Sequence, residues 1–196
     1  VRTLEEEHNN GSADTAMPRI LRDELPTAAM RQHNHTLYER EWQQAYQAQR
    51  DALDAVRDAL LHNRDLCLFL DAPGGTGKTF TANAMLHCVR GQGHVALAVA
   101  STGIAALLLE GGRTFHSRFK PSRIPDPDKN LNIVAESPEA QLIREARLIL
   151  WDEAAMGHKF HLDALNRTLQ DLMSFVDPEL RDRPFGGKII VLCGGM

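Results

Sequence analysis

The sequence predicts an α/β fold in which a parallel sheet is covered by helices. Three observations lead to this prediction. Four short apolar runs, each bounded by turn residues, have the length and continuity of strands buried on both faces. Stretches with helical periodicity alternate with these runs along the chain. A glycine-rich loop joins the first apolar run to the helix that follows it.

The N-terminal part of the chain has no clear period. Residues 1–36 mix acidic residues, prolines and short polar stretches, so we expect a poorly ordered lead-in or the tail of an upstream domain. From residue 37 to 62, apolar residues recur at spacings of three and four, which predicts one amphipathic helix. Residues 37–196 are expected to form a single domain.

The remaining elements follow from the pattern of apolar residues. The runs expected to be strands cover residues 66–70, 95–100, 148–151 and 189–193. The helical stretches cover residues 78–90, 104–109, 139–145 and 162–175. Residues 121–138 are rich in proline and are expected to form an insertion loop on the surface. No apolar run approaches the roughly 20 residues needed to cross a bilayer, so we expect no membrane contact.

The glycine-rich loop predicts a phosphate-binding site between a strand and a helix, which is the context that this motif requires. Glycines let successive backbone N–H groups turn toward one centre, where the helix N-terminus adds positive potential. The ammonium of Lys78 would bind the phosphates of ATP, and the hydroxyl of Thr79 would bind Mg²⁺. Ala72 takes the place of the first glycine, so this is the relaxed form of the motif. The expected nucleotide contacts are Gly74, Gly75, Thr76, Gly77, Lys78 and Thr79.

Two adjacent acids follow the third apolar run. A carboxylate at the end of a neighbouring parallel strand is where the metal of a phosphate loop needs its second ligand, so Asp152 is predicted to bind Mg²⁺. Glu153 is placed to polarise the attacking water as a general base. Taken alone, an apolar run that ends in Asp-Glu could also be a strand reaching solvent. Together with the phosphate loop, the two acids predict an ATPase.

A basic and aromatic stretch is a candidate for contact with nucleic acid. Residues 113–123 carry four cations, two phenylalanines and a histidine, and no acidic residue. Cations would bind phosphates and aromatic faces would stack on the bases of a single strand. On composition alone, a solvated basic loop with core phenylalanines fits equally well. The hydroxyls of Ser101 and Thr102 would also suit a phosphate, although an N-cap for the next helix is favoured from these residues alone.

The net charge and the positions of the cysteines and histidines restrict how the chain can bind DNA or metal. The net charge of −4 supplies no basic field over the whole molecule, so any contact with DNA has to be local. The cysteines have no C-x-x-C spacing and lie in or beside apolar segments, which predicts buried reduced thiols. They are Cys67, Cys88 and Cys193. The pair His158 and His161 lacks companions at metal-ligand spacing and is expected to be solvated or packed.

In order and spacing, these motifs resemble one family: the superfamily-one 5′-to-3′ DNA helicases of the petite-integration-frequency (Pif) type, which include the helicase half of Helitron transposons. The resemblance covers about three quarters of the chain. It rests on residues 71–79, 100–106, 112–117, 148–154 and 185–188. It implies a RecA-like phosphate-loop NTPase domain, with ATP and Mg²⁺ as cofactors and single-stranded DNA or a DNA fork as partner.

The resemblance also implies roles for individual residues. Gln49 would read the adenine ring. Contacts with DNA would come from Ser101, Thr102, Arg113, His116 and Ser117. The family implies ATP hydrolysis coupled to translocation on DNA, in repair, recombination, telomere maintenance or Helitron transposition. We expect an intracellular protein, with the nucleus ahead of the mitochondrion.

Two parts of the family pattern lack a counterpart. Where the family continues with an aspartate after Gly195, this chain has Met196. We expect the second motor domain to be missing, and with it the arginine that the family uses to reach the γ-phosphate, a group worth roughly 10³–10⁵ in rate in related NTPases. We therefore expect a monomeric fragment, truncated before the second motor domain, that binds Mg-ATP and DNA, hydrolyses ATP poorly and unwinds nothing.

Two other functions remain open from the sequence. The first is a AAA-type remodelling ATPase, which also combines a phosphate loop with Asp-Glu but works as a ring. The second is a transposon-derived remnant that holds nucleotide or DNA without turnover. The intact set of Lys78, Thr79, Asp152 and Glu153 argues against long decay.

Overall fold

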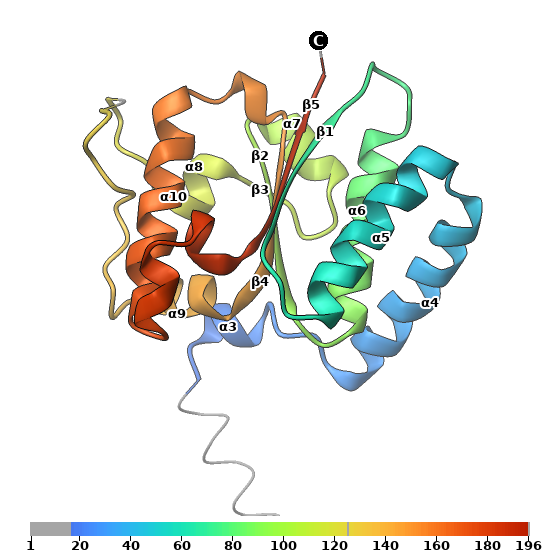
Figure 1. Cartoon of the computed structure of the whole chain (residues 1–196), viewed down its shortest axis with the longest axis horizontal. Coiled ribbons are helices and arrows are strands. Elements are labelled where there is room, and N and C mark those ends of the chain that lie inside the picture. The colour runs from blue at the N-terminus through green and yellow to red at the C-terminus, as the bar shows by residue number, and fades with distance from the viewer. Residues whose placement is uncertain (1–16, 125, 196) are drawn as a thin grey trace, which may run out of the picture.

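The computed structural model describes residues 17–124 and 126–195, and within them one parallel sheet forms the centre of the molecule (Figure 1). Its strand order is β1-β5-β4-β2-β3. The strands are β1 (Leu66–Asp71), β2 (Val95–Ala100), β3 (Arg113–Thr114), β4 (Ala146–Asp152) and β5 (Ile189–Gly194). All four strands predicted from apolar runs are confirmed. The short β3 was not predicted, because two residues are too few to show a period.

Helices cover both faces of the sheet, so the predicted α/β class is confirmed (Figure 1). One face carries α4 (Ala28–Gln44), α5 (Gln47–Leu61), α6 (Lys78–Gly91) and α7 (Gly103–Leu108). The other carries α3 (Arg19–Arg22), α8 (Phe115–Phe119), α9 (Pro138–Glu145) and α10 (Lys159–Ser174). A hydrophobic core lies on each face of the sheet, and successive strand residues contribute to opposite cores. Leu148 and Leu150 of β4 face the first core, and Ile149 and Trp151 face the second.

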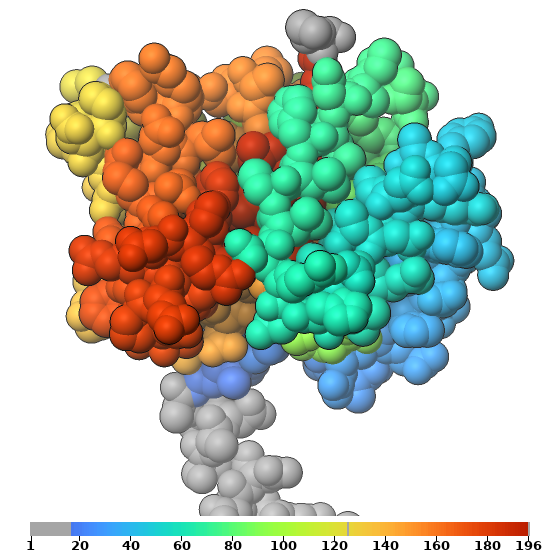
Figure 2. All heavy atoms as spheres, viewed as in Figure 1, coloured from blue at the N-terminus to red at the C-terminus, as the bar shows by residue number. Residues whose placement is uncertain are grey.

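Strand β1 departs from the prediction that every strand is buried on both faces. It lies at the edge of the sheet, and its residues alternate between half-buried and exposed. Cys67 and Phe69 are exposed, so the predicted burial is wrong for the Cys67 thiol. In Figure 2 the atoms of β1 lie on the surface, between the α5 side and the α10 side of the molecule. An unbroken apolar run therefore does not distinguish this edge strand from the central ones.

The expectation of a poorly ordered segment up to residue 36 is wrong for the described part of that segment. Residues 17–36 contain α3 and the first half of α4, whereas residues 1–16 lie outside the described residues. Thr27 caps α4 by accepting a hydrogen bond from Met30 N at 3.3 Å. The helix was missed because its buried face includes the polar Asn34 and Tyr38 instead of an apolar stripe.

The single helix predicted over residues 37–62 is also corrected, because α4 and α5 are separate. The chain turns extended at Ala45 and Tyr46, and Tyr46 N donates to Gln49 Oε1 at 2.9 Å at the start of α5. A cap built from tyrosine and glutamine lacks the Ser, Thr, Asp or Asn that usually marks a helix start. The boundary between α4 and α5 therefore has no recognisable signal in the sequence.

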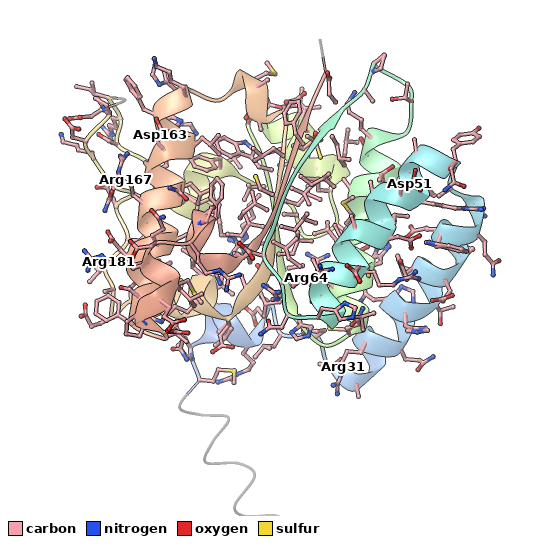
Figure 3. The ribbon with its side chains drawn as sticks, in the orientation of Figure 1. Arg31, Asp51, Arg64, Asp163, Arg167 and Arg181 are labelled. Carbon is pink, nitrogen blue, oxygen red and sulfur yellow. The ribbon has the colours of Figure 1, made fainter. Side chains whose placement is uncertain are left out.

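The proline-rich segment forms a surface loop, as predicted, in its described residues (Figure 1). Arg167 of α10, labelled in Figure 3, holds this loop by donating to Asn130 Oδ1 at 3.0 Å and to Lys129 O at 2.9 Å. The 3₁₀ turns η1 (Ala154–Met156), η2 (Pro178–Arg181) and η3 (Pro184–Gly187) complete the connections. Among the described residues, no helix combines the length and the apolar character needed to span a membrane.

Candidate nucleotide and nucleic-acid site

The phosphate loop connects β1 to α6 through a backbone that requires glycine at two places. Gly75 and Gly77 have φ of +77° and +85°, in the left-handed region that other residues rarely adopt. A Cβ on Gly77 would also lie 2.7 Å from Gln49 Nε2. Ala72, in contrast, is not among the residues with positive φ. The alanine in the relaxed motif therefore carries no backbone strain.

Lys78 is the first residue of α6, and its ammonium lies over the loop. Nζ donates to Pro73 O at 3.0 Å and to Ala72 O. The same side chain lines a cavity of about 230 Å³ together with Asp152, Glu153 and Gly195. The loop, the lysine and the two acids predicted to act together therefore converge at the carboxyl ends of the strands.

The two acids lie one strand further from the loop than we expected. The sheet order puts β5 between β1, which leads into the loop, and β4, which ends in Asp152. The interpretation of β4 as the immediate neighbour of the loop strand is thus corrected. The glycines Gly194 and Gly195 follow β5 and occupy the intervening place, where a Cβ on Gly195 would lie 2.9 Å from Lys78 Nζ. Residues without side chains leave the lysine and the carboxylates open to the same space.

Asp152 and Glu153 have different surroundings. Asp152 is 8% exposed, and its Oδ1 accepts a hydrogen bond from Glu153 N at 2.9 Å. Burial raises the pKa of the Asp152 carboxyl, and the hydrogen bond from the Glu153 N–H opposes this rise. Glu153 is half-buried and has φ +53°, in the left-handed region. Its side-chain Oε2 accepts a hydrogen bond from Thr102 Oγ1 at 2.7 Å.

The donor set fits a divalent cation that is held jointly with a phosphate. In residues 17–124 and 126–195, no group of three or more His, Cys, Asp or Glu side chains could hold a metal by itself. Asp152 offers a buried carboxylate, and Thr79 offers a hydroxyl in the first turn of α6. Mg²⁺ is commonly bound by one or two protein oxygens plus the phosphates of a substrate, which this set matches.

Gln49 lies beside the phosphate loop, in a cavity of about 290 Å³ that Tyr46, Phe69 and Lys78 also line. Its Nε2 donates to Thr76 O at 3.2 Å, and its Oε1 accepts from Tyr46 N. The structure therefore brings Gln49 to the loop although 27 residues separate it from Thr76. Tyr46 and Phe69 were not predicted as cavity residues, because neither belongs to a motif.

Ser101 and Thr102 follow β2 and bind the end of β4. Ser101 Oγ donates to Glu153 O at 2.7 Å and accepts from Trp151 Nε1 at 3.0 Å. Thr102 Oγ1 accepts from Ala105 N at 3.2 Å, so the N-cap that we favoured from the residues alone is confirmed. The hydrogen bonds from both hydroxyls to Glu153 were not predicted, since about fifty residues separate the partners.

The basic and aromatic stretch divides into a buried part and an exposed part. Phe115 and Phe119 are 1% and 0% exposed, and Phe115 stacks on Trp151 with ring centroids 4.0 Å apart. The expectation that these phenylalanines offer faces to bases is therefore wrong. Arg118 is buried as well, in an ion pair with Glu24. The spacing of four between the phenylalanines is typical of a helix that buries one face, and it could have revealed this outcome.

Three predicted contact residues of this stretch remain exposed: Arg113, His116 and Ser117. The His116 ring lies next to His161 of α10, with centroids 5.3 Å apart in an edge-on arrangement. Burial lowers the pKa of His161, and the charges of His116 and His158 add to this effect. The pair His158 and His161, expected to be solvated or packed, thus lies beside a candidate contact residue.

Comparisons with known proteins agree with this geometry. A family model described as PIF1-like helicase matches residues 44–196. The chain is 32% identical over 130 residues to the ATP-dependent DNA helicase Pif1 of Psychrobacter sp. (strain PRwf-1), and 31% identical over 133 residues to the ATP-dependent DNA helicase PIF4 of Trypanosoma brucei brucei. Each alignment covers 65% of this chain, which spans 18% and 15% of the two relatives.

Solved structures show the same similarity. Bacteroides Pif1 bound to single-stranded DNA has a TM-score of 0.58 and 26% identity, over 73% of this chain and 31% of that one. Bacteroides Pif1 in complex with ADP-AlF3 and single-stranded DNA has a TM-score of 0.59 and 25% identity, over 74% of this chain and 31% of that one. The chain thus resembles about a third of each of these solved proteins.

Proposed function

The chain belongs to the PIF1-like helicase family, and on this basis we propose that it carries the ATP site and a single-stranded DNA site of an ATP-dependent 5′-to-3′ DNA helicase. Single-stranded DNA or a DNA fork is the proposed substrate. The observation that carries the proposal is the hydrogen bond between Thr102 and Glu153. It joins a candidate DNA contact to the candidate general base at the same edge of the sheet.

The proposed division of roles in the ATP site follows from chemistry. The loop N–H groups and the Lys78 ammonium bind the phosphates, and Gln49 reads the adenine ring. Thr79 and Asp152 are the proposed protein ligands of Mg²⁺, which when bound neutralises charge on the phosphates. Glu153 accepts the proton of the attacking water. The convergence of Lys78, Asp152 and Glu153 on one cavity supports these roles.

The proposed DNA contacts lie on the exposed part of the basic stretch and at the start of α7. Arg113 binds a phosphate through its guanidinium, and His116 and Ser117 add hydrogen bonds to the backbone. Ser101 and Thr102 complete the set through their hydroxyls. Similarity to proteins solved with single-stranded DNA supports this assignment. The burial of Phe115 and Phe119 favours recognition of the backbone over stacking on bases.

The nucleotide assignment is tested by titrating a fluorescent ATP analogue with Mg²⁺. Replacing Lys78 removes charge-assisted hydrogen bonds to phosphate, so Lys78→Ala is expected to weaken binding about tenfold or more. Lys129→Ala removes an exposed lysine from the surface loop and is the matched control, with unchanged affinity expected. Equal affinities for Lys78→Ala and the unmodified protein would contradict the proposed ATP site.

A further inference from the structure

The single proton of the Thr102 hydroxyl is already engaged in a hydrogen bond. Oγ1 donates to Glu153 Oε2 at 2.7 Å and accepts from Ala105 N at 3.2 Å. A threonine hydroxyl has only one hydrogen to donate. Thr102 can therefore donate to the Glu153 carboxylate or to a phosphate oxygen of DNA, and not fully to both.

Hydrogen bonds to the main chain also hold Glu153 in place directly after β4. Its main-chain oxygen accepts from Ser101 Oγ at 2.7 Å, and its N–H donates to Asp152 Oδ1 at 2.9 Å. Its backbone has φ +53° and ψ +36°, in the left-handed region that non-glycine residues rarely adopt. Because the backbone is fixed in this way, the hydrogen bond to Thr102 decides where the carboxylate points.

The hydrogen bond also occupies one oxygen of the Glu153 carboxylate. Releasing this hydrogen bond frees that oxygen and lets the carboxylate turn toward an attacking water. Glu153 is thus expected to act best once Thr102 has turned to another acceptor.

The surroundings of Thr102 leave room for such an acceptor. A Cβ on the next residue, Gly103, would meet no atom within 4 Å, and Ile104 is 80% exposed. Thr102 itself is half-buried, between this open surface and Glu153. Its side chain therefore lies at the boundary between the ATP site and the proposed DNA site.

We propose that Thr102 is a positioning residue that couples DNA binding to the state of Glu153. Without DNA, the Thr102 proton holds the Glu153 carboxylate. A backbone phosphate of single-stranded DNA takes over that hydrogen bond, and the released carboxylate becomes available as a base. Only a hydrogen bond changes partner in this step. The inference rests on the proposed function, since it takes Thr102 to be a DNA contact.

Reciprocity gives a test that does not depend on catalysis. If DNA and Glu153 compete for one proton, Glu153 must weaken DNA binding through Thr102. Binding of a fluorescein-labelled oligodeoxythymidine is measured at fixed salt for the unmodified chain, Glu153→Ala, Thr102→Val and the double variant. We expect Glu153→Ala to tighten binding about tenfold more when Thr102 is present than in the Thr102→Val background. In the Thr102→Val background, Glu153→Ala reports only the effect of removing one negative charge.

Further variants separate positioning from damage to the fold. Thr102→Ser keeps the hydroxyl, so in this background Glu153→Ala is expected to tighten DNA binding as much as it does when Thr102 is present. Thr27→Val removes the threonine N-cap of α4 and is expected to leave DNA affinity unchanged. In ATP turnover, Thr102→Val is expected to raise the rate without DNA and to abolish stimulation by DNA, whereas a merely structural defect would lower both rates.

Two other results would have different meanings. Equal effects of Glu153→Ala in both backgrounds, with DNA still bound, would overturn the competition and leave the proposed function standing. Absence of DNA binding by every variant, including the unmodified chain, would overturn the proposed DNA site and the inference with it.

Discussion

His87 shows how one side chain can join three parts of the molecule. It is buried on α6, with Nδ1 2.7 Å from Glu41 Oε2 of α4 and Nε2 2.5 Å from Glu110 Oε2, just after α7. Burial alone would lower the pKa of His87, but the hydrogen bonds to the two glutamates outweigh it, so this pKa is raised. Both ring nitrogens therefore donate, and the imidazolium holds α4 and the end of α7 against α6.

A pH dependence of stability follows from this raised pKa. The imidazolium is stabilised in the folded protein, so its contribution is fully present below the unfolded pKa of about 6.5 and is lost as pH rises through the folded value. We expect the free energy of unfolding to exceed that of His87→Gln at pH 6, with the gap shrinking toward pH 9. Urea titrations across this range measure it, with the exposed His35→Gln as control. A gap independent of pH would contradict the assigned charge.

Glycines of the phosphate loop provide a second test at the residue scale. Gly77→Ala places a Cβ at φ +85° and 2.7 Å from Gln49 Nε2, so we expect a loss of about 1–2 kcal/mol in the free energy of unfolding. Gly74→Ala is the matched control, because its Cβ would meet nothing within 4 Å and no positive φ is required. Thermal unfolding without nucleotide compares the two variants, and equal melting temperatures would contradict the described loop.

Individual site residues were predictable where a motif fixed their chemistry. Lys78, Thr79, Asp152 and Glu153 could be assigned because a phosphate loop and a strand-ending acid pair have a definite spacing and context. The partners of these residues could not be assigned. The Thr102–Glu153 hydrogen bond joins residues 51 apart and depends on β2 and β4 being neighbours in the sheet. Sequence patterns carry no such information about pairing.

At the scale of elements, buried apolar patterns were the reliable signal. The central strands β2, β4 and β5 and the helices α6, α9 and α10 were expected because their apolar residues keep a period or a continuous run. Helix α4 failed to show a period because its buried residues are Asn34 and Tyr38 instead of an apolar stripe. The backbones of α4 and α6 approach each other so closely that a Cβ on Gly91 would lie 3.0 Å from His35 N. Short elements such as β3 and α8 are set by the packing around them.

Helix α8 is expected to depend on Phe115. This ring is 1% exposed and stacks with Trp151 of β4 and with His161 of α10. Phe115→Ala should lower the free energy of unfolding by about 3–5 kcal/mol, through lost burial and a cavity. The matched control is Phe69→Ala, since the Phe69 ring is 54% exposed and should contribute far less. Chemical denaturation compares the variants, and similar losses for both would contradict the burial of α8.

At the scale of the whole molecule, charge limits how DNA can be bound. The net charge is −4, so attraction to phosphates has to come from local cations such as the exposed Arg113. Each phosphate neutralised on a single strand contributes about 0.7 to the slope of log affinity against log salt. We expect Arg113→Ala to weaken binding of single-stranded DNA and to reduce this slope by about 0.7. Titrations at several salt concentrations measure both effects.

The control for Arg113 is another exposed arginine. Arg181, labelled in Figure 3, lies in η2 and is exposed, and Arg181→Ala should leave the slope unchanged. Equal changes in slope for the two variants would indicate diffuse attraction and contradict a local DNA site.

We propose that one edge of the sheet couples ATP hydrolysis to single-stranded DNA. The most direct test of this coupling is the steady-state rate of Mg-ATP hydrolysis by this chain, with and without single-stranded DNA, beside Lys78→Ala. We predict a rate that DNA raises and that Lys78→Ala abolishes. A rate that DNA leaves unchanged, or one that persists in Lys78→Ala, would contradict it.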